Sequence, residues 1–283
     1  MRRALSDVQL IERSIQKKYR KELWTPFVAA VKRYELVQAG DRVAVCISGG
    51  KDSMLLAKLT QLLQRYSDVP FQAKYLVMDP GYSPENRRRI EQNAARLGIP
   101  VEIFETDIFD AANRVEKNPC YLCARMRRGH LYSRAQALGC NKIALGHHFN
   151  DVIETTVMGM LYGAQLQGMM PKLHSANFPG MQLIRPLYCV HEDDIIAWAR
   201  YNGLAFLQCA CRFTEGAAGG AVDSKRQEVK RLLRDLRRDN PDVEKSVFNA
   251  VHAVSLDTFP GWKTRGEAHS FLEWYDERGS EDV

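Results

Sequence analysis

Between residues 40 and 204, short apolar runs alternate with longer amphipathic stretches along the chain. The runs are rich in β-branched residues and too short for helices, so each of them predicts a strand. Strands are expected at 42–47, 73–78, 101–105, 142–145 and 181–184. Helices are expected at 53–65, 84–97, 107–115, 121–138, 150–163 and 192–202. This alternation predicts an α/β fold, a parallel twisted sheet with helices on both faces.

The two ends of the chain carry a helical pattern instead. Residues 7–38 are expected to be helical, with Pro26 breaking or kinking the run. Residues 164–180, rich in Gly, Met and Pro, are interpreted as a loop, and the tail from 223 onward is expected to be helical. The predicted organisation is therefore an N-terminal helical extension at 1–39, a central domain at 40–212 and a C-terminal helical region at 213–283.

Composition places the chain among ordinary globular proteins. Of its 283 residues, 45% are hydrophobic and 26% are charged. No run of about 18 uninterrupted apolar residues is present, so a membrane span is not expected. The first residues lack the apolar core of a secretory signal. We therefore expect a cytoplasmic protein.

Basic residues gather in two clusters, although the net charge is only +6. One cluster contains Arg13, Lys17, Lys18, Arg20 and Lys21. The other contains Lys225, Arg226, Lys230, Arg231, Arg234, Arg237 and Arg238. Clusters of this kind suit a polyanion, and the alternative is a solvated helix face. Val229, Leu232, Leu233 and Leu236 are expected to pack, leaving the second basic cluster outward.

A glycine-containing loop lies directly between the first predicted strand and the helix that follows it. Its residues are Ser48, Gly49, Gly50, Lys51, Asp52 and Ser53. Glycine lets the backbone approach a phosphate closely, and the helix N-terminus adds unpaired N–H donors. A carboxylate beside phosphate needs a cation, so Asp52 is expected to hold Mg²⁺ or to orient a reacting group. The spacing of an ordinary P-loop is absent. The alternative is a tight turn without a ligand.

The seven cysteines do not indicate a disulfide framework, because their number is odd and the chain is long. Cys120 and Cys123 form a Cys-x-x-Cys pair at the start of a predicted helix, near several arginines that favour thiolates. Cys209 and Cys211 follow about ninety residues later. Zinc, an iron–sulfur cluster and a redox dithiol all fit this spacing. Cys46, Cys140 and Cys189 are expected to be inert core thiols.

A second dense motif runs from the end of the strand 142–145 into the next helix and contains Gly146, His147, His148 and Asp151. Ligands of open α/β sheets bind at the carboxyl ends of the strands. We therefore expect the two histidines and Asp151 to face the same crevice as the glycine loop.

Together, these motifs make the chain similar to the PP-loop ATP pyrophosphatases. Within that family it looks most like the tRNA 2-thiocytidine synthetases, over residues 40 to 245 approximately. The similarity also includes Tyr162-Gly163, the segments 168–173 and 184–187, and Lys225 to Val229. The resemblance implies a PP-loop ATP-binding catalytic domain at 40–212.

What the resemblance implies is an ATP-dependent tRNA sulfurtransferase. ATP–Mg²⁺ would bind with its phosphates on the glycine loop and its adenine near the main chain of Met78, and Gly146, His147 and Asp151 would complete the cofactor site. Adenylation of the C2 oxygen of an anticodon-loop cytidine would let sulfur replace it. The implied partners are tRNA, a sulfur donor such as a cysteine desulfurase or sulfide, and a second copy in a homodimer. Both basic clusters are candidate tRNA contacts.

The resemblance also implies a four-iron, four-sulfur (4Fe-4S) cluster held by three cysteines, with one iron open for a sulfur atom. Cys120 and Cys123 would be two ligands, and these cysteines, Asp52 and Asp151 would be catalytic. The third ligand comes from Cys209-Ala210-Cys211, where the family usually has Cys-x-x-Cys. Counting back through the helix 192–202 without gaps favours Cys209, with Cys211 as the alternative.

A further departure is that the family usually has two acidic residues after the histidine pair, where this chain has Asn150-Asp151. The acidic role is therefore assigned to Asp151 alone. Other readings stay open: a PP-loop enzyme acting on another tRNA position or a small molecule, a redox or metal-sensing nucleotide-binding module, or a zinc-stabilised nucleic-acid-binding protein. The last of these leaves the glycine loop unexplained.

Overall fold

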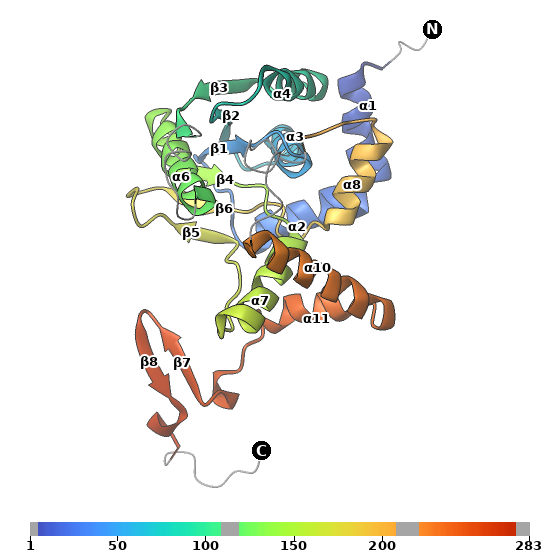
Figure 1. The fold of residues 1–283 in the computed structure, drawn as a ribbon. Coiled ribbons are helices and arrows are strands. Elements are labelled where there is room, and N and C mark those ends of the chain that lie inside the picture. The colour runs from blue at the N-terminus through green and yellow to red at the C-terminus, as the bar shows by residue number, and fades with distance from the viewer. Residues whose placement is uncertain (1–4, 109–118, 208–220, 276–283) are drawn as a thin grey trace. The chain divides into compact units, whose positions relative to one another are not determined.

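The computed structural model describes residues 5–108, 119–207 and 221–275 (Figure 1). The chain divides into two compact units, residues 1–230 and 231–283. The first unit contains a six-stranded sheet in the order β3-β2-β1-β4-β6-β5. Its strands are β1 (Arg42–Ile47), β2 (Gln72–Asp79), β3 (Val101–Glu105), β4 (Lys142–Ala144), β5 (Lys172–His174) and β6 (Gln182–Ile184). The first four and β6 are parallel, and β5 pairs antiparallel to β6 at the edge.

Helices precede, connect and follow the strands of the first unit. They are α1 (Asp7–Arg13), α2 (Thr25–Arg33), α3 (Lys51–Tyr66), α4 (Pro84–Leu97), α6 (Pro119–Ala137), α7 (Phe149–Gly163) and α8 (Glu192–Tyr201). The predicted caps of α4 are confirmed, because the Ser83 side chain accepts from the Asn86 N–H and Gly98 ends the helix in the left-handed conformation. The predicted helix at 107–115 lies largely outside the described residues.

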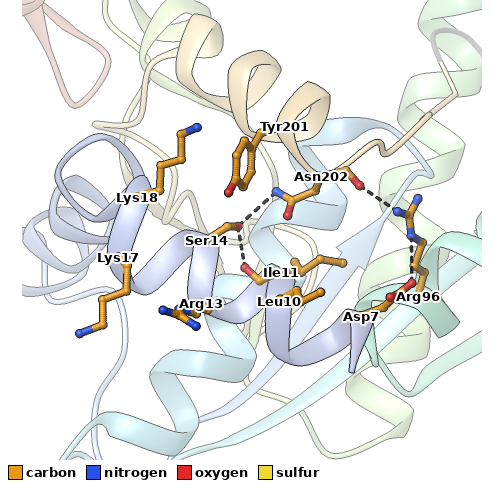
Figure 2. A pocket seen from close by; sticks show the side chains of 10 residues that line it. All are labelled: Asp7, Leu10, Ile11, Arg13, Ser14, Lys17, Lys18, Arg96, Tyr201 and Asn202. Carbon is orange, nitrogen blue, oxygen red and sulfur yellow. Dashed lines mark hydrogen bonds and ion pairs between the residues drawn. The ribbon is translucent and has the colours of Figure 1, made fainter. Parts of the chain in front are cut away.

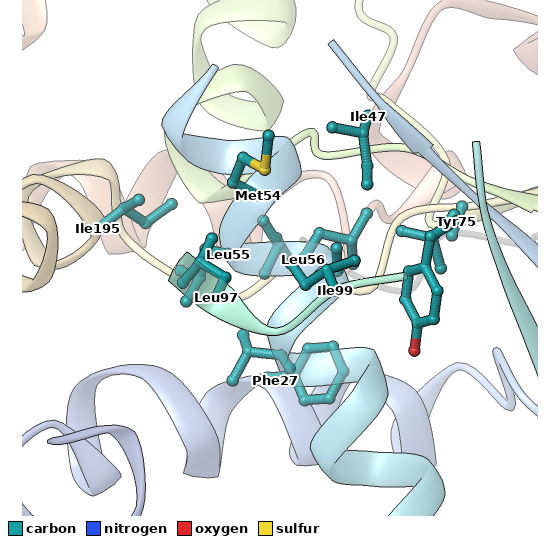
Figure 3. Close-up of a cluster of buried hydrophobic side chains, with 14 of the residues drawn as sticks. Phe27, Ile47, Met54, Leu55, Leu56, Tyr75, Leu97, Ile99 and Ile195 are labelled. Atoms are coloured by element: carbon teal, nitrogen blue, oxygen red, sulfur yellow. The ribbon is translucent and has the colours of Figure 1, made fainter. Parts of the chain in front are cut away.

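Hydrophobic residues cover both faces of the sheet, as predicted. Val43, Val45 and Ile47 of β1 belong to the larger cluster, which also includes residues of α2, α3 and α8 (Figure 3). Ala44 and Cys46 belong to a second cluster with residues of α6. Alternate residues of a strand point to opposite faces, so β1 is buried by a helical layer on each side. The predicted α/β fold is confirmed.

The N-terminal extension is helical but irregular. Two π-helical segments, Ser14–Lys18 and Arg20–Trp24, separate α1 from α2. The interruption lies at Tyr19, and Pro26 sits in the first turn of α2, where its missing N–H costs nothing. The expected break at Pro26 was therefore wrong in position. Glu12 anchors the extension, since its carboxylate lies 2.7 Å from the fully buried Lys58 Nζ of α3 and 2.8 Å from Arg65 Nη1.

Two further predictions need correction. The segment 164–180 is not wholly a loop, because β5 pairs with β6. The tail is helical in α10 (Ala221–Asp239) and α11 (Val243–Ala250), and a short 3₁₀ turn lies at Leu256–Thr258. It then forms a hairpin of β7 (Gly261–Thr264) and β8 (Glu267–Ser270), followed by a 3₁₀ turn at Phe271–Glu273. Arg265 and Gly266 both have positive φ, which suits a two-residue hairpin turn.

The predicted division at 39/40 and 212/213 stays a prediction, since compactness alone groups the N-terminal helices with the sheet. Within the part of the chain that the structure describes, no helix has both the length and the apolar character needed to span a bilayer.

A buried ion pair fastens the first turn before the sheet to β4. Lys142 Nζ lies 2.6 Å from Asp41 Oδ2 and donates a second hydrogen bond to the Leu36 carbonyl. Burial opposes ionisation of Asp41, but hydrogen bonds from Lys142, Asn141 and the Gln38 backbone lower the pKa of its carboxyl. The contact joins residues a hundred positions apart at the amino end of the sheet.

Asp41→Ala should lower the free energy of unfolding by about 3–5 kcal/mol, because it leaves a buried ammonium without its partner. The measurement is urea denaturation, with Asp41→Ala/Lys142→Met as the matched control. The double variant should recover much of the loss, since no charge then remains buried. The folded pKa of Asp41 is depressed, so the wild-type advantage is present above pH 3.8 and is lost as the pH falls through the folded value. A single variant as stable as wild type would contradict this account.

Candidate active site

The carboxyl ends of β1 and β4 meet the N-termini of α3 and α7 at one edge of the sheet. The loop 48–50 leads from β1 into α3, and residues 145–148 lead from β4 into α7. Parallel strands that lie side by side bring such loops together. Both motifs singled out in the sequence therefore reach the same crevice.

The glycine loop is held by its own residues. Gly49 has φ +85°, and a Cβ there would lie 2.7 Å from the Ile90 Cγ1 atom, so only glycine fits. The Ser53 hydroxyl accepts from the Ser48 N–H at 3.1 Å and donates to the Gly50 carbonyl at 3.0 Å. Gly50 caps α3 without a side chain, which leaves the first N–H groups of this helix open to an anion.

Gly146 brings the end of β4 against the start of α3. A Cβ at this position would lie 3.0 Å from the Ser53 nitrogen and 3.2 Å from the Asp52 carbonyl carbon. These are backbone atoms and cannot move aside cheaply. The absence of a side chain at Gly146 therefore fixes the distance between the two motifs.

A cavity of about 580 Å³ opens between these loops and α6. Its lining combines apolar side chains with polar residues of the glycine loop, arginines and His147. It is lined by Cys46, Ile47, Ser48, Asp52, Ser53, Met78, Arg127, Arg128, Leu131, Leu145, Gly146, His147, Leu183 and Arg185. Its size and mixed lining are typical of a small-molecule or cofactor site. Arg127 and Arg128 were noted only as arginines beside the Cys-x-x-Cys pair, and Arg185 only within the segment 184–187, so none of the three was predicted to line this cavity.

His147 lines this cavity as a neutral group. Burial lowers the pKa of its imidazole to about 4, although the nearby Asp151 acts in the opposite direction. Its Nδ1 atom is buried and has no hydrogen-bond partner among the described residues. The side chain is thus available to a ligand as a neutral donor or acceptor.

His148 is not among the residues that line the cavity, and it is the N-cap residue of α7. Its backbone N–H donates to Asp151 Oδ2 at 3.0 Å. Its Nε2 atom lies 3.5 Å from Asp151 Oδ2, 3.9 Å from Asp52 Oδ1 and 3.9 Å from Glu192 Oε1. Three carboxylates from three helices therefore surround one imidazole.

Cations from distant segments balance these carboxylates. Lys51 lies 2.9 Å from Glu192 and 3.2 Å from Asp52. Arg226 lies 2.5 Å from Asp151 and 2.8 Å from Glu154, and Lys230 lies 3.1 Å from Glu192. The expectation that the whole second basic cluster faces outward was therefore wrong for Arg226 and Lys230.

The ionisation of the acidic groups follows from these contacts. Burial opposes ionisation of Glu192, but its hydrogen bond with Lys51 and nearby positive charges lower its pKa to about 2. Burial also opposes ionisation of Asp151, whose pKa is nevertheless lowered by the surrounding cations. Burial prevails at Glu154 and raises its pKa despite the bond from Arg226.

Glu154, Glu192 and Asn150 were missed by the sequence analysis. Asn150 Oδ1 accepts from the Glu192 N–H at 2.9 Å, so the residue that departs from the family pattern joins α7 to α8. A signal existed for Glu154, which follows Asp151 by three positions on one helix face. No local signal marks Glu192.

The cysteines fall into two groups. Burial raises the pKa of Cys46 to about 12 and also raises the pKa of Cys140 and Cys189, as expected of core thiols. Cys120 and Cys123 lie in the first turns of α6, and their side chains are outside the described part. Cys209 and Cys211 lie outside the described residues altogether.

Comparisons with known proteins agree with this geometry. A family model described as a PP-loop domain matches residues 13–211. A protein of Citrifermentans bemidjiense named tRNA-cytidine(32) 2-sulfurtransferase is 36% identical over 229 residues, 80% of this chain and 87% of that protein. A protein of the same name from Bordetella pertussis is 36% identical over 265 residues, 89% of this chain and 80% of that protein.

One solved structure has a similar fold. It is the U34-tRNA thiolase of Methanococcus maripaludis with its 4Fe-4S cluster, which has a TM-score of 0.63 and 20% identity. The match covers 91% of this chain and 88% of that one. At this identity the likeness concerns the fold alone.

Gly146→Ala should weaken ATP binding at least tenfold, because the new methyl group pushes β4 and α3 apart at the loop. The measurement is titration calorimetry with a non-hydrolysable ATP analogue. Gly129→Ala in α6 is the control, since a Cβ there meets nothing within 4 Å. This control should bind as wild type does and be about 0.5–1 kcal/mol more stable, the usual gain for alanine over glycine in a helix. Equal affinities for both variants would refute the role of the contact.

His147 should make stability depend on pH. Its folded pKa of about 4 lies below the ordinary 6.5, so the unfolded chain binds more protons between these values. The contribution of neutral His147 to the free energy of unfolding is complete above pH 6.5 and is lost as the pH falls toward 4. Wild type should lose on the order of 1–2 kcal/mol more than His147→Gln between pH 7 and pH 5. Identical losses in chemical denaturation at the two pH values would show that His147 is not buried as a neutral group.

Proposed function

The chain belongs to the PP-loop family and, within it, to the tRNA-cytidine 2-sulfurtransferases, and on this premise we propose that it replaces the C2 oxygen of a tRNA cytidine with sulfur at the expense of ATP. The position printed in the relatives' names is cytidine 32, and we propose the same position here. The observation that carries the proposal is the joining of the glycine loop and the His147 motif in one cavity.

The cavity supports binding of ATP as a substrate. The open N–H groups of α3 and the guanidinium groups of Arg127 and Arg185 suit a triphosphate. Met78 and the leucines of the lining offer an apolar surface for adenine. Attack of the cytidine C2 oxygen on the α-phosphorus would form the adenylated base and release pyrophosphate. Attack of sulfur at C2 would then release AMP, which carries the oxygen away.

Asp52 and Asp151 are proposed to hold the Mg²⁺ that accompanies ATP. Asp52 Oδ1 is buried and accepts no hydrogen bond from the described residues, and its neighbour is the Lys51 ammonium 3.2 Å away, which Mg²⁺ would have to displace. Asp151 faces His148 and Arg226, and its low pKa keeps it ionised. Oxygen donors of this kind suit magnesium. Lys51 would neutralise the phosphates from the first turn of α3.

Cys120, Cys123 and Cys209 are proposed to hold a 4Fe-4S cluster. Cys120 and Cys123 stand three positions apart on α6, so they share one face of the helix, and three thiolates are a suitable donor set for iron. When bound, the cluster supplies the sulfur atom in nucleophilic form. Arg127 and Arg128, which follow on the same helix, line the cavity and connect the two parts of the site.

The remaining parts of the proposal concern the setting of the reaction. We propose that the protein works in the cytoplasm, that a cysteine desulfurase or free sulfide supplies the sulfur, and that two copies form a homodimer. The division into a helical extension at 1–39, a catalytic domain at 40–212 and a helical region at 213–283 is part of the same proposal.

The test is iron and acid-labile sulfide per chain in anaerobically purified protein, together with 2-thiocytidine in treated tRNA measured by mass spectrometry. Cys120→Ala and Cys209→Ala should lose both cluster and product, whereas Cys211→Ala and Cys189→Ala should keep both. Asp52→Asn should keep the cluster and lose the product, because adenylation fails. Zinc in place of iron, or 2-thiocytidine formed without ATP, would contradict the proposed reaction.

A further inference from the structure

A second cavity, of about 620 Å³, lies between α1, the first π-helical segment and the C-terminal end of α8 (Figure 2). It is lined by Asp7, Leu10, Ile11, Arg13, Ser14, Lys17, Lys18, Arg96, Tyr201 and Asn202. None of these residues lines the cavity at the glycine loop. No step of the reaction proposed above uses a residue of this second cavity.

The charge of this cavity is positive and largely uncompensated. Arg13, Lys17 and Lys18 are exposed and form no ion pair among the described residues. The acidic neighbour Glu12 is turned inward to Lys58 and Arg65 and cannot neutralise them. Asp7 is the one carboxylate among the described residues of the lining, and it lies 3.8 Å from Arg96.

The π-helical segment Ser14–Lys18 determines the positions of these cationic side chains. The Tyr19 N–H donates to the Ser14 carbonyl at 2.8 Å, five residues back, which widens the turn. Ser14 then points inward, where its hydroxyl accepts from Trp198 Nε1 at 3.1 Å and Asn202 Nδ2 at 3.2 Å. Lys17 and Lys18 are left at one end of the cavity, and Asp7 and Arg96 lie at the other (Figure 2).

Aromatic rings accompany the cations. Tyr201 is 55% exposed, and Lys18 Nζ lies 3.7 Å from the centre of its ring. Lys17 also lines a neighbouring cavity of about 300 Å³ with Gln16, Arg20, Trp24 and Tyr66, and Tyr66 is 56% exposed. Arg13, Lys17, Lys18, Arg20, Tyr66 and Tyr201 therefore form one continuous surface, called here the N-terminal basic surface.

This combination of side chains fits nucleic acid better than it fits a protein partner. Cations in a row match the repeated charge of a phosphate backbone, and exposed rings between them offer stacking to an unpaired base. An acidic protein segment would use the cations but would leave Tyr66 and Tyr201 without a flat partner.

The surface also lies at a suitable distance from the proposed reaction site. Glu192 and Tyr201 are at opposite ends of α8, which has 10 residues and is therefore about 15 Å long. Lys51 and Tyr66 are at opposite ends of α3, which has 16 residues and is about 24 Å long. An RNA with its reactive base at the glycine loop is long enough to reach the surface as well.

We propose that the N-terminal basic surface binds the sugar–phosphate backbone of the RNA substrate, with phosphates at Arg13, Lys17 and Lys18 and a base or ribose against Tyr201. The inference rests on the proposed function, because it takes the RNA to be the tRNA that is thiolated.

The test compares Lys17→Ala/Lys18→Ala with Lys32→Ala/Lys74→Ala in the whole 283-residue chain. The control removes the same charge from exposed residues that line neither of these two cavities. Binding of fluorescent unmodified tRNA is followed by anisotropy between 50 and 200 mM salt. The Lys17/Lys18 variant should bind tRNA at least tenfold more weakly at the lower salt. The slope of the logarithm of its binding constant against the logarithm of the salt concentration should be smaller in magnitude by about 1.5 to 2. Tyr201→Ala should bind tRNA about fivefold or more weakly than wild type, with no change in the slope of the salt dependence.

Measurements of thiolation and of ATP binding distinguish this proposal from the proposed function. In the Lys17/Lys18 variant the KM for tRNA should rise while kcat and the affinity for ATP stay at wild-type values. Unchanged tRNA affinity in this variant, beside a wild-type enzyme that thiolates tRNA, would overturn the inference and leave the proposed function standing. Loss of sulfur delivery from a protein donor with full tRNA affinity would assign the surface to a protein instead. A wild-type protein that neither binds nor thiolates tRNA would overturn both.

Discussion

The meeting of Gly146 with the first turn of α3 is the contact on which the rest of the site depends. Two backbones lie so close that a Cβ at Gly146 would stand 3.0 Å from the Ser53 nitrogen, tighter than nine in ten contacts of real Cβ atoms. The glycine loop, His147 and Asp151 gain their relative positions from this contact, although they come from segments about a hundred residues apart. Because the contact is between backbones, it is insensitive to side-chain rotamers and gives the crevice a fixed width. Binding a triphosphate then requires little reorganisation of the protein, which is the main advantage of a preformed site.

Charge balance around His148 adds a second constraint. Asp52, Asp151 and Glu192 would repel one another in a partly buried place, and Lys51, Arg226 and Lys230 offset this repulsion. Two of these cations, Arg226 and Lys230, come from the first part of α10. That part of the helix therefore contributes to the charge balance of the active site. The proposed binding of ATP–Mg²⁺ brings new charges of both signs into this network. The ion pairs of Arg226 and Lys51 are consequently the contacts that must adjust when substrate enters.

Much of the fold could be read from the sequence, because buried strands and capped helices leave local patterns. The strand Arg42–Ile47 and the capped helix Pro84–Leu97 were predicted to the residue. The two motifs were predicted to share one crevice because both follow the carboxyl ends of parallel strands, and residues of both do line one cavity. Glu192 and Arg226 were missed, since each matters only through a partner far away in sequence. The π-helical segments and β5 were missed for a similar reason: packing against α8 and pairing with β6 decide their conformation, and neither leaves a periodic trace.

The π-helical segments also determine where the N-terminal extension tolerates a change in its length. A residue on an α-helix is rotated by about 100° from the one before it. The wide turns at Ser14–Lys18 and Arg20–Trp24 absorb residues that a regular helix would have to place on another face. Deleting one residue within a wide turn would restore regular winding while the flanking side chains keep their faces, whereas the same deletion in a regular turn would carry every later side chain around the axis by about 100°. The two wide turns are therefore the places in the extension where a residue can be lost with the least change in how the later residues face α8.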